Sequence, residues 1–295
     1  MTKLNVAVYA EGCMYPSSAD QAVSTTISQL QQSGFKSVIL SLFHIGRDYD
    51  ISPTQNMGDL YYNGKLIISE GSYVGDPTWP KLINTIIGGS VEQLCASIGG
   101  GIGVLDFQTI QRIYQGNGGS FNGTNLEKNC AVLKAIFPGI SIIDMDCEDT
   151  YDQPSFVAFC EMLIGLGFGI TFCPYCPVGL WIDALAVLNT THQGAVKWWN
   201  LQCYDGGQSN DPSTWADLIK QKIPAFSTDG FILASDWTAH SPNEMQAWIG
   251  RFKKESCVGG AFIWTLDQII EKAPKDPLAL MKEYVDAITT ALGNV

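Results

Sequence analysis

Basic side chains are scarce in this sequence. Its 295 residues include 17 Lys and Arg against 29 Asp and Glu, which gives a formal net charge of −12. A protein that binds nucleic acid or an anionic membrane surface needs a basic stripe to neutralise phosphates, and no such stripe is present. We therefore expect no nucleic-acid partner, whereas a neutral ligand such as a sugar is compatible with an acidic surface.

Long apolar runs are also missing. No stretch of about 18 consecutive apolar residues occurs, so we expect no membrane span. The chain begins with a single Lys and a short apolar run broken by Asn5 and Glu11, which is not the pattern of a secretory signal peptide. The expected location is therefore the cytoplasm, or the outside after export by a non-classical route.

Motifs of several enzyme classes are absent as well. The three histidines, His44, His192 and His240, are far apart and lack the spacing of zinc ligands. The sequence contains neither a Gly-Lys-Ser/Thr phosphate loop nor a Gly-x-Ser-x-Gly nucleophile motif. We expect no cofactor and no metal.

The cysteines do not predict a disulfide framework, because the nine of them are odd in number and scattered. Several lie in apolar runs, where a free Cys behaves as a small hydrophobic side chain. Cys173 and Cys176 have the spacing of a dithiol redox motif, but that chemistry needs the first Cys at a helix N-terminus. Here the motif follows a predicted strand, so a redox function is disfavoured.

What the sequence does contain is a regular alternation of strand-like and helix-like runs. An Asn-Gly pair within residues 59–69 adds a predicted hairpin after the second strand. Eight strand–helix units in a chain of this length are typical of one (β/α)₈ barrel over residues 1–295, and less so of a doubly wound open sheet. The predicted strands are 4–9, 37–43, 91–98, 140–143 with the acids that follow, 169–173, 195–203, 230–234 and 259–264. The predicted helices are 19–33, 78–87, 107–114, 124–137, 154–165, 179–188, 212–222, 242–254 and 277–292.

The fourth strand carries the strongest functional signal. The apolar run 140–143 is followed by Asp144, Asp146 and Glu148 at alternate positions. Successive side chains of a strand point to opposite faces, so these three acids are expected to share one face at the strand's C-terminal end. Acids beside a buried strand are costly unless protons are shared or a ligand intervenes, which indicates an active site. A Mg²⁺ or Ca²⁺ site is the competing interpretation, although adjacent acids on one straight strand converge poorly on an ion.

Further candidates lie at the ends of other strands, where the active site of a (β/α)₈ barrel is built. Glycines after strand three allow close backbone approach to a ligand. After strand six, a Tyr supplies a hydroxyl donor on an aromatic body. A Trp at the end of strand eight offers a floor for a sugar ring. The candidates for substrate contact are Phe43, Gly99, Gly100, Gln202, Tyr204, Asp205 and Trp264.

Together these residues resemble glycoside hydrolase family 18, the chitinase-type (β/α)₈ barrels. The family's Asp-x-Asp-x-Glu signature is similar to Asp144-Met145-Asp146-Cys147-Glu148. The Ser-x-Gly-Gly, Tyr-Asp and strand-eight Trp features are similar to Ser97 with Gly99 and Gly100, to Tyr204 with Asp205, and to Trp264. Two departures stand out: Ser141-Ile142 replaces the usual Asp-Gly, and Gln202 stands where the family usually has Met.

The resemblance implies a retaining, substrate-assisted hydrolysis in which the N-acetyl oxygen of the substrate attacks its own anomeric carbon. It implies that Glu148 is the general acid and then the base, that Asp146 orients the acetamido group, and that Asp144 shares its proton. Tyr204 would bind the acetamido oxygen, Asp205 a sugar hydroxyl, and Trp264 would stack under the ring.

The implied substrate is chitin, a chitooligosaccharide or another glycan that contains N-acetylglucosamine. Three interpretations stay open on the sequence: a chitinase, an endo-β-N-acetylglucosaminidase that acts on N-glycan cores, and a non-catalytic sugar-binding barrel.

Overall fold

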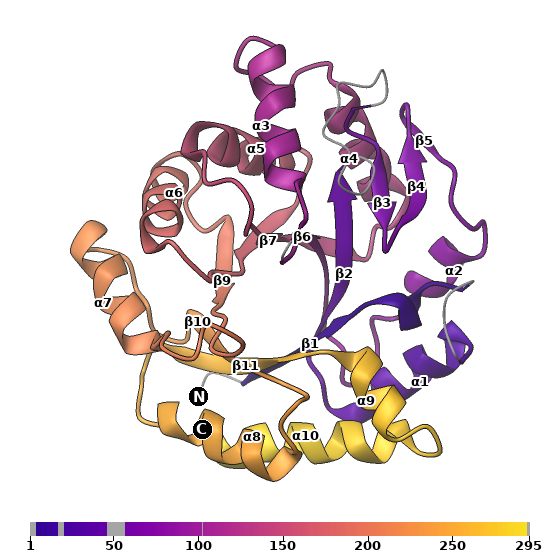
Figure 1. Cartoon of the computed structure of the whole chain (residues 1–295), viewed down its shortest axis with the longest axis vertical. Helices are drawn as coiled ribbons and strands as arrows, with labels where there is room; N and C mark the ends of the chain where they lie inside the picture. Colours follow the sequence, from indigo (N-terminus) through magenta and orange to yellow (C-terminus); the bar gives the residue numbers. More distant parts are fainter. Residues whose placement is uncertain (1–3, 17–20, 46–56, 102, 294–295) are drawn as a thin grey trace.

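The protein is a closed barrel of eight parallel strands surrounded by helices, seen end-on in Figure 1 of the computed structural model. The structure describes residues 4–16, 21–45, 57–101 and 103–293. Around the barrel the strand order is β1-β2-β6-β7-β8-β9-β10-β11, and pairing of β1 with β2 closes the ring. This confirms the predicted (β/α)₈ fold. The barrel strands are β1 (Asn5–Ala10), β2 (Ser37–Ile45), β6 (Gln93–Gly99), β7 (Ile140–Asp146), β8 (Gly169–Phe172), β9 (Val196–Asn200), β10 (Ile232–Trp237) and β11 (Val258–Trp264).

The helices lie outside the strands and agree with most of the predicted ranges. They are α1 (Val23–Ser33), α2 (Trp79–Ile83), α3 (Asp106–Gly116), α4 (Asn125–Ile136), α5 (Gln153–Gly165), α6 (Val178–Thr191), α7 (Pro212–Lys222), α8 (Pro242–Ile249), α9 (Leu266–Lys272) and α10 (Pro277–Leu292). None of the helices in the described part of the chain is long and apolar enough to cross a membrane.

Three predicted helix ranges are longer than the helices in the structure, and one helix was not predicted. The range 19–33 begins too early, because α1 starts at Val23; residues 19 and 20 lie outside the described part of the chain. The range 78–87 was too long, because α2 ends at Ile83 and the chain then turns. The predicted range 242–254 was also too long, because α8 ends at Ile249 and a 3₁₀ turn, Gly250–Phe252, follows. Helix α9 was missed, because it is only seven residues long and its N-cap side chain makes no capping hydrogen bond. Start signals were more reliable where a cap exists, as in the Ser241–Glu244 capping box of α8.

The predicted hairpin is confirmed as an extension of the sheet outside the barrel. Strand β3 (Leu60–Tyr62) pairs antiparallel with β2 and with β4 (Lys65–Ser69), and β5 (Ser72–Tyr73) follows. The turn residues Asn63 and Gly64 both have positive φ, 45° and 74°, as a tight two-residue hairpin turn requires.

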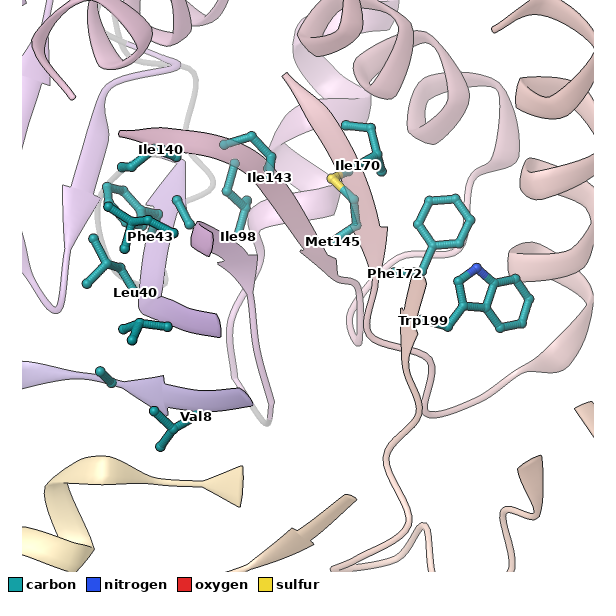
Figure 2. Packing of buried hydrophobic residues seen from close by; sticks show 14 of the residues in the cluster. Val8, Leu40, Phe43, Ile98, Ile140, Ile143, Met145, Ile170, Phe172 and Trp199 are labelled. Atoms are coloured by element: carbon teal, nitrogen blue, oxygen red, sulfur yellow. The ribbon is translucent and has the colours of Figure 1, made fainter. Parts of the chain in front are cut away.

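Alternation along the strands sorts the side chains into two layers. Odd-numbered residues of β7 such as Ile143 and Met145 belong to the large cluster between strands and helices, part of which Figure 2 shows. A smaller apolar cluster fills the barrel interior and includes Ala7, Cys95 and Leu233. From Ile142 onward the even-numbered residues of β7 face this interior: Ile142 belongs to the small cluster, and Asp144 and Asp146 follow it on the same face. The acids are therefore presented inside the barrel at its C-terminal mouth.

The glycines at the end of β6, Gly99 and Gly100, allow β6 and β7 to come close together. Gly99 has φ of +113°, and a Cβ there would lie 2.0 Å from the backbone oxygen of Asp146. The same oxygen accepts a hydrogen bond from the Gly100 N–H at 2.8 Å. Gly99 and Gly100 thus set the backbone contact that holds Asp146 in place.

Replacing Gly99 with Ala is expected to lower the free energy of unfolding by about 2 kcal/mol or more, because both the clash and the positive φ oppose a side chain. Gly165→Ala is the matched control, since nothing lies within 4 Å of that added Cβ at the end of α5. Urea denaturation of both variants tests this. Equal stability of the two variants would show that the β6–β7 contact is not constrained as described.

Candidate active site

The three acids occupy successive levels of the barrel mouth. Asp144 is fully buried, Asp146 is 5% exposed, and Glu148 is partly exposed. The alternate spacing of the acids predicted that Glu148 lies on the strand. Strand β7 instead ends at Asp146, and Glu148 lies in the loop that follows. Its place above the strand end leaves Glu148 open to a ligand in the mouth, while the two aspartates lie beneath.

Asp144 is saturated with hydrogen bonds. One carboxylate oxygen accepts from the hydroxyls of Tyr9 and Ser97, both at 2.8 Å. The other accepts from Thr171 at 2.7 Å and from the Asn200 amide at 2.9 Å. Burial raises the pKa of Asp144, and these four donors from four different strands oppose that rise because they favour the charged form. The four donors occupy the acceptor positions of an ionised carboxylate, so Asp144 acts as a fixed negative charge in the barrel.

Asp146 and Glu148 form a pair that Gln202 bridges. The Gln202 amide nitrogen lies 3.1 Å from Oδ1 of Asp146 and 3.0 Å from Oε1 of Glu148. The pKa of Asp146 is raised well above its ordinary value, first by burial and then by the charges of Glu148 and Asp144. A hydrogen bond to Glu148 acts in the same direction. Burial, the two neighbouring carboxylates and the contact with Glu148 thus all favour the protonated form of Asp146.

Aromatic side chains form one wall of the mouth. Trp264 lies at the end of β11 with its ring 5.6 Å from that of Tyr9. Tyr204 packs parallel to Trp237, with ring centroids 6.1 Å apart and an interplanar angle of 18°. Burial raises the pKa of the Tyr204 hydroxyl well above its usual range, and the neighbouring Cys173, Asp146 and Glu148 raise it further. Tyr204 thus stays a neutral hydrogen-bond donor close to the acid pair.

Two predicted contact residues lie elsewhere. Phe43 is fully buried in the outer layer, where it packs against Tyr62 and Trp79. It has no surface left for a substrate, because strand β2 points it toward the hairpin and not into the barrel. Asp205 is exposed in the loop after β9 and has φ of 37°. Its role as a contact to a sugar hydroxyl stays a prediction.

Sequence reasoning missed several members of the site. Tyr9, Thr171 and Asn200 bind Asp144 from β1, β8 and β9, and their inward direction follows from strand alternation once the barrel register is known. The useful signal was a polar residue inside an apolar strand, as at Thr171 in β8. Cys173 was considered for redox chemistry, but burial and the charges of Asp146 and Asp144 raise the pKa of its thiol well above the ordinary value, which disfavours the thiolate that such chemistry needs. Its buried thiol hydrogen-bonds Asp146 instead.

A second acidic group lies at the rim, between the loops after β1 and β11. Asp267 accepts hydrogen bonds from the backbone N–H groups of Glu11 at 2.7 Å and Cys13 at 2.8 Å. Burial raises the pKa of Glu11 to about 7, and the charge of Asp267 adds to the rise. Glu11 therefore changes its charge near neutral pH.

This shift predicts a pH-dependent stability. The folded protein keeps a proton on Glu11 up to about pH 7, whereas the unfolded chain releases it near pH 4.5. The contribution of Glu11 to the free energy of unfolding is therefore fully present below about pH 4.5 and is lost as the pH rises to about 7. Glu11→Gln abolishes the dependence. Relative to wild type, the variant should gain up to about 3 kcal/mol of unfolding free energy between about pH 4.5 and about pH 8. Urea denaturation at both pH values measures this; a difference that does not change with pH would contradict it. Glu283→Gln on the exposed face of α10 is the control.

No three His, Cys, Asp or Glu side chains in the described ranges are arranged to hold a metal ion. The three acids of β7 and its loop bind protein donors and each other, as described above. The arrangement is suited to moving a proton between carboxyl groups and a ligand in the mouth.

Comparison with known proteins identifies the fold. No protein-family model matches the chain, and no curated protein sequence matches it. Among solved structures, the catalytic domain of a family GH18 chitinase from the fern Peteris ryukyuensis has a TM-score of 0.58 at 15% identity, covering 97% of this chain and 98% of that one. The spore cortex-lytic enzyme SleL of Bacillus megaterium has a TM-score of 0.55 at 9% identity, covering 96% and 74%.

The same comparison includes a protein with a different name and activity. Tryptophan synthase of Mycobacterium tuberculosis has a TM-score of 0.51 at 8% identity, covering 97% of this chain and 93% of that one. A fold that hosts such different proteins assigns no activity by itself. The chain has the (β/α)₈ barrel fold, and its function must be argued from the site.

Proposed function

We propose that the protein is a glycoside hydrolase that cleaves β-1,4-linked N-acetylglucosamine, in the manner of a chitinase, with retention of configuration. One observation carries the proposal: a partly exposed Glu148 lies beside a buried Asp146 whose pKa is raised well above its ordinary value, Gln202 contacts both carboxyl groups, and the buried Asp144 lies beneath them. The resemblance of these acids to the family 18 signature supports the same conclusion.

Stacking of the acids on one strand end argues against a two-carboxylate mechanism. Retaining enzymes of that kind place their acids on opposite sides of the scissile bond, about 5–5.5 Å apart. Here the acids come from the end of β7 and the loop that follows it, so a ligand in the mouth meets them from one side. A nucleophile from the substrate itself solves the problem, and the acetamido oxygen of N-acetylglucosamine is such a group.

The proton that Asp146 and Glu148 share is the one the reaction needs. Glu148 delivers it to the leaving glycosidic oxygen as the C–O bond breaks and the acetamido oxygen bonds to the anomeric carbon. Both members of the pair are then anionic beside the positive oxazolinium ion, which they stabilise. Glu148 next takes a proton from the water that attacks the anomeric carbon, and the acetamido group is restored.

The remaining residues hold the substrate in this scheme. The Tyr204 hydroxyl hydrogen-bonds the acetamido oxygen and directs it toward the anomeric carbon. Trp264 supplies a stacking surface for the sugar ring, and Asp146 orients the acetamido N–H. Asp144, bound to its four donors, keeps a negative charge beneath the pair, which raises the pKa of Asp146 and so helps to keep the shared proton on the pair until Glu148 delivers it.

The direct test is turnover of a fluorogenic N,N′-diacetylchitobioside and of chitopentaose by the wild-type protein, with an N-glycan core glycan as a parallel substrate. Release from the first two supports the proposal. Cleavage of the N-glycan core alone would replace chitin with that substrate. Binding of chitopentaose without cleavage would identify a sugar-binding barrel. If the protein neither binds nor cleaves any of these glycans, the proposal is refuted.

A further inference from the structure

Gln202 is held more firmly than a residue that only lines a cleft. Its side chain is 7% exposed. Its backbone N–H donates to the Pro174 carbonyl at 2.9 Å, and its own carbonyl accepts from the Asn210 amide at 2.7 Å. Asn210 in turn accepts from the indole N–H of Trp215 on α7 at 3.3 Å. These contacts from two neighbouring loops fix the backbone from which the amide of Gln202 reaches the acids.

Both hydrogens of that amide are used. One bonds Oδ1 of Asp146 at 3.1 Å and the other bonds Oε1 of Glu148 at 3.0 Å. An amide nitrogen has two donors, so Gln202 occupies one oxygen of each acid with neutral donors. We propose that Gln202 is a positioning residue that clamps Glu148 beside Asp146 and sets the pH range in which the pair holds a single proton. This inference rests on the proposed function of Glu148 and Asp146 and adds a determinant of its pH dependence.

The groups around the pair make such a donor necessary. Asp144 on β7, Cys173 after β8, Tyr204 after β9 and Tyr9 on β1 interact with Asp146. Tyr151 in the loop after β7 faces Glu148 and donates to its backbone carbonyl at 3.3 Å. These neighbours are acids, phenols and a thiol, and none of them is a cation. The Gln202 amide therefore supplies donors that stabilise the charge of the pair without adding a charge of its own.

The direction of the effect follows from the form that the amide favours. A donor to a carboxylate stabilises the ionised form and lowers the pKa. The donor to Oδ1 of Asp146 therefore opposes the rise in the pKa of Asp146 that burial and the neighbouring acids cause. Loss of the amide should raise the pKa of Asp146 further, and the pH range of activity should move toward alkaline pH.

Gln202→Met removes both donors with little change in side-chain volume, and Gln202→Glu replaces them with a third acid. The midpoint of the acidic limb of kcat/KM against pH should rise by about one unit in Gln202→Met, the effect expected for losing a hydrogen bond to a charged group. The rise should be larger in Gln202→Glu. Gln221→Met, on the exposed surface of α7, is the matched control and should leave the profile unchanged.

A second readout does not need turnover. Carboxyl ¹³C resonances of the wild type and of Gln202→Met, assigned with Asp146→Asn and Glu148→Gln, report the titration of the pair directly. A raised titration midpoint for Asp146 in Gln202→Met supports the inference. Unchanged midpoints, or lower activity with an unchanged pH profile, overturn it. If the wild type cleaves no substrate, the proposed function fails, while the carboxyl titration still decides whether Gln202 controls the pair.

Discussion

Replacing Glu148 with Gln is expected to lower kcat/KM for chitooligosaccharides by a factor of about 10²–10⁴, the usual contribution of a positioned general acid. Gln keeps the shape of Glu and can still accept the hydrogen bond from Gln202, but it carries no transferable proton. Because Glu148 is partly exposed and acts on the leaving oxygen, ligand affinity should change little. The loss should therefore appear in kcat and not in KM.

Glu283→Gln on the outer surface of α10 is the control for this experiment, since it removes an exposed carboxylate far from the barrel mouth. It should retain full activity. A Glu148→Gln enzyme that keeps more than a tenth of wild-type turnover would show that another group delivers the proton. Unchanged binding of chitopentaose by titration calorimetry would show that the variant is folded and fails only in chemistry.

The largest expected effect on stability is that of Asp144→Asn. The carboxylate accepts from Tyr9, Ser97, Thr171 and Asn200. An amide offers one oxygen acceptor, so two of these buried donors would face the new NH₂ group. At about 1–3 kcal/mol for each unsatisfied buried group, the free energy of unfolding should fall by about 3 kcal/mol. Activity should fall as well, because the negative charge beneath Asp146 is lost.

Asp217→Asn on the exposed face of α7 is the matched control and should unfold within about 0.5 kcal/mol of the wild type. Guanidinium denaturation at neutral pH compares the three proteins. If Asp144→Asn were as stable as the control, the four donors would have other partners available, and Asp144 would not be the fixed charge described above.

How far the sequence predicts this molecule depends on the range of each signal. Strand alternation is local, and it placed Asp144 and Asp146 correctly on one buried face of β7. It failed at Glu148, because a pattern of alternate acids does not show where a strand ends. It also failed at Phe43, which lies on the outer face of β2. Alternation alone does not show which face of β2 points into the barrel and which points outward to the hairpin, where Phe43 lies.

Long-range contacts were beyond sequence reasoning. The donors to Asp144 are 27 to 135 residues away along the chain, and only closure of the barrel brings them together. Gln202 was recognised as a candidate contact, but its bridge between two carboxylates depends on the register of β9 against β7 through β8. Motif spacing located the site, and barrel geometry decided which side chains complete it.

The central claim is that the acetamido group of the substrate is the nucleophile, and the anomeric form of the product tests this most directly. Chitopentaose is mixed with the enzyme and the anomeric ¹H signals are recorded before mutarotation. The account predicts that the new reducing end appears first as the β anomer, and that a fully deacetylated glucosamine oligomer is not cleaved. First appearance of the α anomer, or equal cleavage of the deacetylated oligomer, would contradict it.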